Sequence, residues 1–123
     1  KRNQNDLLLL KDGKKKEEYR ISEILLNFDS EKEKIDLINN INDQINKIGF
    51  ENTALRFSES TSSIGNGDLG WVNTDGLTKK ISDVLIKMNI KDISKPILIG
   101  NSIIFIKLTD KKSSTISAEE IED

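Results

Sequence analysis

The segment from Ser58 to Gly70 holds most of the side chains whose types and spacing could do chemistry. The sequence has no histidine and no cysteine, so imidazole bases, thiolate nucleophiles and ordinary zinc sites are excluded. A serine nucleophile in the cluster Ser58–Ser63 would need a base, and only carboxylates and lysines are available. No Ser-x-x-Lys spacing occurs at a plausible helix start. The simpler alternative is a polar, glycine-rich surface loop.

Two further patterns in this segment do not complete a known site. The glycine-rich run at residues 65–70 is not followed by Lys-Ser/Thr or by a helix, as a phosphate-binding loop would be. Asp68 and Asp75 could coordinate calcium, but their spacing is not that of an EF-hand. The alternative is that Asp68 accepts hydrogen bonds from a turn. We therefore expect no metal and no cofactor.

Composition limits the classes of function. A chain of 123 residues and 13.9 kDa is sufficient for one domain. Its formal net charge of −2 argues against a basic surface for nucleic acid. No apolar run approaches the roughly 20 residues of a membrane span. The chain begins with Lys1 rather than Met, so we expect it to be part of a longer, multi-domain protein.

Hydrophobic spacing predicts the elements that must position any site. Ser30 and Glu33 form a capping box at the start of a helix over residues 31–48, and Gly49 stops it. Isoleucines share one face of this helix: Ile35, Ile38, Ile41, Ile45 and Ile48. The other predicted elements are a strand at Tyr19–Phe28, a short helix at Asn52–Phe57, a short strand at Trp71–Val72, a helix at Thr78–Asn89, and a hairpin of Ile97–Ile99 with Ile103–Leu108.

This order of strands and helices predicts the α+β class. We expect one domain at residues 19–110. Residues 1–18 would be a linker or the remnant of a neighbouring domain, and the polar residues 111–123 an acidic tail or linker.

Several segments together carry a family resemblance. They are Tyr19–Leu26, Gly67–Trp71, Ile93–Ile97 and Ile104–Asp110. In this order they resemble the parvulin family of peptidyl-prolyl cis–trans isomerases (PPIases, rotamases), and most nearly the SurA-like periplasmic chaperones. The resemblance implies a parvulin-like fold, with a small four-stranded antiparallel sheet flanked by about four helices.

The resemblance also implies where a substrate proline would lie. The apolar positions that hold the proline ring fall on Leu69, Leu77 and Ile81, with Trp71 also assigned to substrate binding. Ile81 stands where an aromatic side chain is usual. For Leu77 and Ile81 the alternative of a purely structural core role stays open, because helical spacing alone would bury them.

The polar positions of the family have diverged. Its two histidines fall on Glu23 and Ile104, its cysteine or aspartate on Ser60, and its hydroxyl position on Asn101. The resemblance implies that Ser60 and Asn101 contact the substrate amide, with Glu23 as a third diverged catalytic position.

Two functions therefore stay open. The first is a parvulin-type PPIase that assists the folding of secreted or outer-membrane proteins. The second is a non-catalytic chaperone module that binds peptides on the same surface, and a spacer domain is a third alternative. Both main readings imply unfolded or proline-containing polypeptides as partners, without nucleic acid or metal. The resemblance implies a periplasmic location.

Overall fold

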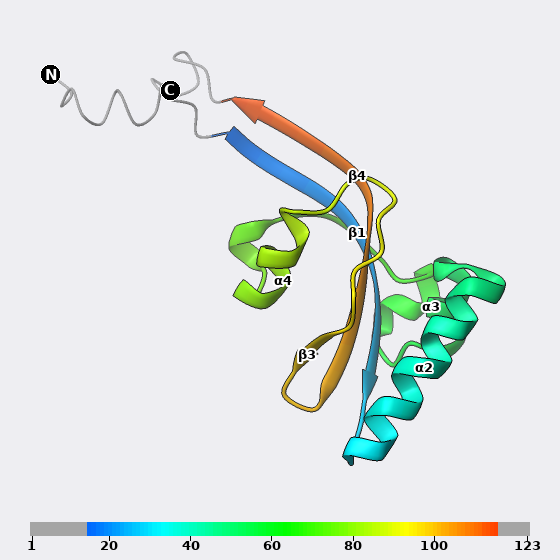
Figure 1. Cartoon of the computed structure of the whole chain (residues 1–123). Coiled ribbons are helices and arrows are strands. Elements are labelled where there is room, and N and C mark those ends of the chain that lie inside the picture. The colour runs from blue at the N-terminus through cyan, green and yellow to red at the C-terminus, as the bar shows by residue number, and fades with distance from the viewer. Residues whose placement is uncertain (1–14, 116–123) are drawn as a thin grey trace, which may run out of the picture.

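The computed structural model describes residues 15–115 (Figure 1). Its strands and helices are β1 (Lys15–Asn27), α2 (Glu31–Ile48), α3 (Phe50–Phe57), the 3₁₀ turn η1 (Thr61–Gly65), β2 (Asp68–Asn73), the 3₁₀ turn η2 (Thr74–Gly76), α4 (Lys79–Leu85), β3 (Ile97–Ile99) and β4 (Ser102–Thr115). One antiparallel sheet has the order β2-β1-β4-β3. The predicted α+β class and four-stranded sheet are confirmed. The described residues form three α-helices rather than about four.

The sheet is built on a long ribbon of β1 and β4 (Figure 1). Their pairing runs from Lys15 opposite Thr115 to Asn27 opposite Ser102. Both strands extend past the range 19–110, while the domain bounds themselves stay a prediction. Most of the predicted linker at 1–18 and tail at 111–123 lies outside the described residues.

Helices cover both faces of this ribbon, with α4 on one side and α2 and α3 on the other (Figure 1). We call these the α4 face and the α2 face. The buried core of the α4 face comprises Tyr19, Ile21, Leu85, Met88, Ile97, Ile104, Ile106 and Leu108. That of the α2 face comprises Ile24, Leu26, Ile41, Phe50, Ala54, Ile103 and Phe105. Since neighbouring residues of a strand point to opposite faces, β1 and β4 supply both cores.

Helix α2 has the predicted ends. The Ser30 Oγ accepts a hydrogen bond from the Glu33 N–H at 3.1 Å. The Glu33 carboxylate accepts from the Asp29 N–H at 2.6 Å, one residue earlier than an ideal capping box requires. Gly49 ends the helix with φ of 88°, a conformation that favours glycine.

Helix α4 is shorter than predicted, ending at Leu85 rather than Asn89. The Met88 N–H donates to the carbonyl of Leu85, three residues earlier, which closes a tighter turn than that of an α-helix. The Asn89 N–H then turns to the Asp92 carboxylate at 2.9 Å. Met88 stays in the core, which explains why the apolar period continues beyond the helix. Within residues 15–115 we find no helix of the length and apolarity that crossing a membrane requires.

Candidate functional site

A carboxylate and two hydroxyls meet on the α4 face. Glu23 lies between Ile21 and Leu25 of β1, both of which pack on that side. The Ser60 Oγ donates a hydrogen bond to the Glu23 Oε2 at 2.6 Å, and the Ser62 Oγ donates to the same oxygen at 2.8 Å. The two serine oxygens are 3.0 Å apart, and all three side chains are half-buried. This arrangement fixes the orientation of the Glu23 carboxylate.

Hydrogen bonds with the backbone of β1 hold the serine segment against the edge of this strand. The Ser58 Oγ accepts from the Leu25 N–H at 3.0 Å, and the Glu59 N–H donates to the Leu25 carbonyl at 2.7 Å. Further along, the Glu23 N–H donates to the Gly67 carbonyl at 2.9 Å. The segment thus occupies the edge of β1 beyond the end of β2.

Gly67 is required at this junction. Its φ is +86°, and a Cβ added there would lie 2.5 Å from the Glu23 carbonyl oxygen and 2.9 Å from the Ala54 Cβ. Neither approach is tolerable for a larger residue, and the backbone conformation itself favours glycine.

A second polar cluster lies further along the same face. The Asn27 Nδ2 donates to the Glu59 Oε1 at 3.0 Å, and the Asn27 N–H donates to the same oxygen at 3.2 Å. The Ser102 Oγ donates to the Asn27 Oδ1 at 2.6 Å. Sequence reasoning identified neither this cluster nor Ser62. The sequence does hold one signal for the second polar cluster: alternation in β1 puts residue 27 on the same face as residue 23.

The structure brings together some of the predicted polar residues but not all. Ser60 and Glu23 are in direct contact. Asn101 lies in the β3–β4 turn, where its carbonyl accepts from the Phe28 N–H at 3.0 Å, beside the second polar cluster. Ile104 pairs with Leu25 and is 7% exposed, so it belongs to the core of the α4 face.

The predicted apolar residues are also divided. Leu77 and Ile81 pack partly buried against the core of the α4 face. Leu69 is 40% exposed and stands at the bulge between β1 and β2. Trp71 pairs with Arg20 and lies on the opposite, α2 face, where the Lys112 ammonium is 4.4 Å from its ring centroid. The structure therefore separates Trp71 from Leu77 and Ile81.

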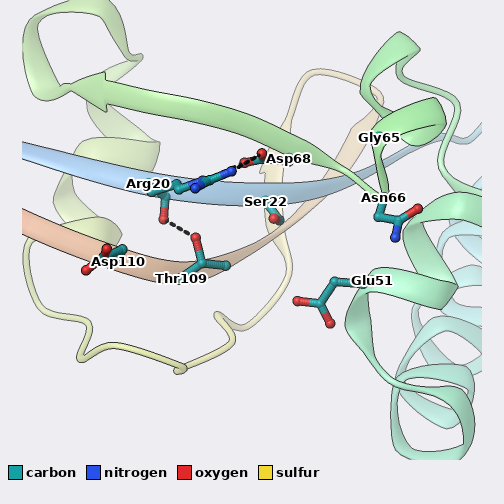
Figure 2. A pocket seen from close by; sticks show the side chains of 8 residues that line it. All are labelled: Arg20, Ser22, Glu51, Gly65, Asn66, Asp68, Thr109 and Asp110. Atoms are coloured by element: carbon teal, nitrogen blue, oxygen red, sulfur yellow. Dashed lines mark hydrogen bonds and ion pairs between the residues drawn. The ribbon is translucent and has the colours of Figure 1, made fainter.

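A polar pocket of about 290 Å³ opens on the α2 face (Figure 2). Its lining residues are Arg20, Ser22, Glu51, Gly65, Asn66, Asp68, Thr109 and Asp110. The Asp68 carboxylate accepts from the Arg20 guanidinium at 2.7 Å and from the Gly70 N–H at 3.0 Å. The Asp68 carboxylate thus caps a turn, and residues 15–115 contain no group of three or more side chains able to hold a metal.

Hydrogen bonds tune two carboxyls of this pocket. The Arg20 guanidinium, with help from the Gly70 N–H, lowers the pKa of Asp68 below its ordinary value. Burial acts to raise the pKa of Glu51, but the hydrogen bond from the Lys107 ammonium at 2.8 Å and further favourable contacts lower it overall. These groups form ion pairs, and none of them touches the Glu23 cluster on the other face.

Comparisons with known proteins agree with this architecture. The family model described as rotamase, a PPIC-type PPIase domain, matches residues 23–110. The chaperone SurA of Idiomarina loihiensis is 26% identical over 114 residues, covering 85% of this chain but only 26% of that protein. This chain therefore spans about a quarter of that relative's length.

Solved structures are similar as well. The crystal structure of a PpiC-type peptidyl-prolyl cis–trans isomerase domain aligns with a TM-score of 0.70 at 29% identity, covering 80% of this chain and 94% of that one. A chain of the SurA-like chaperones PEB4 and Cj1289 of Campylobacter jejuni aligns with a TM-score of 0.69 at 21% identity, covering 99% of this chain and 52% of that one. The latter likeness concerns the fold alone.

Proposed function

Because the family match covers residues 23–110, the chain belongs to the PPIC-type PPIase family, the parvulins, and we propose that it binds Xaa–Pro segments on its α4 face and accelerates their isomerisation. Membership confirms the resemblance predicted from the sequence. The observation that carries the proposal is the contact between Glu23 and Ser60 on the face where Leu77 and Ile81 also pack.

The physical demand on such a site is modest. Rotation about a peptide bond is opposed by a barrier of roughly 18–20 kcal/mol, because resonance stabilises the planar amide. That resonance places negative charge on the carbonyl oxygen, and the charge diminishes when the bond twists. A site that disfavours the planar form relative to the twisted form therefore accelerates rotation without a nucleophile.

The Glu23 cluster has the charge for this task. Ser60 and Ser62 both donate to the Glu23 carboxylate, so the cluster offers oxygen lone pairs and negative charge to a ligand. The negative charge repels the carbonyl oxygen of an amide held beside it. This repulsion is weaker when the amide is twisted than when it is planar, so the barrier to rotation falls. Apolar contact with Leu69, Leu77 and Ile81 would hold the proline ring and exclude water from the amide.

One observation favours the second candidate, a peptide-binding module without catalysis. Ile104 occupies a position where the family has a histidine, and its buried side chain has no polar group to offer. Extended segments would still bind through backbone hydrogen bonds and apolar contacts.

The role of the whole protein is a further part of the proposal. Its relatives include the chaperone SurA and SurA-like chaperones, one of them called a periplasmic protein. They support a longer periplasmic chaperone in which this domain handles unfolded, proline-containing segments of secreted or outer-membrane proteins.

Exchange NMR on a short Xaa–Pro peptide separates the two candidates. An isomerase raises the cis–trans exchange rate well above the unaided rate, whereas a binding module shifts peptide resonances without raising it. Mapping the shifted protein amides locates the ligand, and we expect them around Glu23, Ser60 and Leu77. Exchange at the unaided rate, together with measurable affinity, would rule out the enzyme.

A further inference from the structure

Two carboxylates of the α4 face have no cation beside them. Glu23 is bound by the hydroxyls of Ser60 and Ser62, and Glu59 is bound by Asn27. Neither takes part in an ion pair within residues 15–115, where eight of the fifteen carboxylates do. Those paired carboxylates are Glu17, Glu18, Glu31, Asp36, Asp43, Glu51, Asp68 and Asp83.

Two lysines of α4, the helix on this face, are already engaged. The Lys79 ammonium contacts the Asp83 carboxylate at 2.9 Å. The Lys80 ammonium donates to the Leu98 carbonyl on β3 at 2.9 Å. The negative charges of Glu23 and Glu59 are therefore left for a ligand to neutralise.

We propose that this face selects Xaa–Pro segments that carry lysine or arginine next to the proline, with Glu23 and Glu59 as the residues that set this specificity. The inference rests on the proposed function, since it assumes that the proline segment lies on the α4 face. It adds a class of substrate, basic rather than acidic or phosphorylated, which the family match does not supply.

The spacing of the carboxylates suits one extended segment. Glu23 and the Glu59 partner, Asn27, are four positions apart on β1, roughly 13 Å at the usual rise of a strand. An extended ligand of about four residues covers that distance. A lysine or arginine that flanks a proline held near Glu23 can then reach one carboxylate with its long side chain.

The expected preference is modest, because both carboxylates are partly open to water. A solvent-screened ion pair changes affinity by about two- to five-fold. The preference should also shrink as salt is added, because surface charges are screened. A phosphoserine before the proline should lower the rate, since its charge repels both carboxylates.

The test uses matched peptides that differ only beside the proline. Lysine, norleucine or glutamate is placed before the proline in one set and after it in a second set. The readout is the ratio of kcat/KM for the lysine peptide to that for the norleucine peptide, so a change in basal rate cancels. We expect a ratio of about two to five in at least one set and a glutamate ratio below one.

Variants assign the preference to its residues. Glu59→Gln and Glu23→Gln should each bring the lysine ratio toward one. Asp43→Asn removes a matched charge on α2, across the sheet, and should leave the ratio as it is. Equal kcat/KM for all peptides, or a ratio that neither substitution at the α4 face alters, would overturn the inference while leaving isomerisation intact.

Failure of the proposed function has a different signature. If no peptide is accelerated, the preference is read from dissociation constants in NMR titrations, where the lysine peptide must have a lower constant than the norleucine peptide. If no peptide is accelerated or bound, both the function and the specificity are wrong.

Discussion

At the scale of single residues, the site depends on where the hydroxyl protons of Ser60 and Ser62 point. Both are directed at Glu23, so the serines are acceptors toward any ligand. A histidine at position 23 would instead present an N–H or a bare nitrogen. Glutamate in place of histidine at position 23 therefore changes the charge of the site, while hydrogen bonds still hold the side chain in place.

Leu69 and Trp71 should behave differently in peptide binding, although the sequence resemblance assigns both to it. Leu69→Ala should weaken the affinity for an Xaa–Pro peptide by about tenfold, because a partly exposed apolar contact is lost. Trp71→Ala should leave the affinity within about twofold, since Trp71 lies on the α2 face beside Lys112. Titration by NMR measures both. A larger loss at Trp71 than at Leu69 would contradict the assignment of the α4 face.

Asp68 should make stability depend on pH. Because its pKa is lower in the folded protein than in the unfolded chain, its ion pair stabilises the fold above the ordinary carboxyl pKa of about 4. This contribution disappears as the pH falls through the lowered pKa. Asp68→Asn should therefore reduce Tm at pH 7 and matter progressively less below pH ~4.

The control for this experiment is Asp75→Asn, which removes an exposed carboxylate in η2. Its effect on Tm should be small at every pH. A deficit for Asp68→Asn that is equally large at pH 7 and at strongly acidic pH would show that the ion pair with Arg20 is not its source.

Only part of the site was accessible from the sequence. Glu23 and Ser60 were singled out through the resemblance. Ser62, Asn27 and Glu59 were not, because their contacts join residues 32 to 39 positions apart. No local pattern specifies such contacts; they arise only once the serine segment docks on the edge of β1.

At the scale of elements, the junction between Gly67 and β1 connects the site to the sheet. Gly67→Ala should destabilise the domain by at least about 2 kcal/mol, because it combines an unfavourable backbone conformation with a clash against the Glu23 carbonyl. Gly76→Ala is the matched control, since a Cβ there meets nothing within 4 Å. Urea unfolding compares the two, and equal stability for both variants would contradict this role of Gly67.

The two amphipathic helices show which local signals suffice. Both ends of α2 follow from residues next to them, Ser30 and Gly49. The end of α4 does not, because the turn after it is set by distant contacts. The Lys91 N–H donates to the Leu108 carbonyl at 2.6 Å with φ of 81° at Lys91. Periodicity alone extended the predicted helix to Asn89.

At the scale of the whole molecule, one ribbon serves two cores. The run Ile103–Leu108 is continuously apolar except for Lys107, and its residues alternate between the cores of the two faces. A central strand that is buried on both faces does not show the alternation of apolar and polar residues found in a strand with one face exposed to solvent. The sequence therefore predicted strands and class, whereas the strand order and the helix on each face required the family resemblance or the structure.

The proposed function gives Glu23 on the α4 face the role of promoting rotation of an Xaa–Pro bond. This role is tested by the rate of cis–trans exchange in a peptide, measured by NMR with the unmodified chain and with Glu23→Gln. The substitution keeps size and removes charge, and we predict a decrease in kcat/KM of about tenfold or more. Thr61→Ala removes an exposed hydroxyl of η1 between Ser60 and Ser62 and should keep the original rate. A folded Glu23→Gln protein that isomerises the peptide as fast as the unmodified chain would contradict the claim.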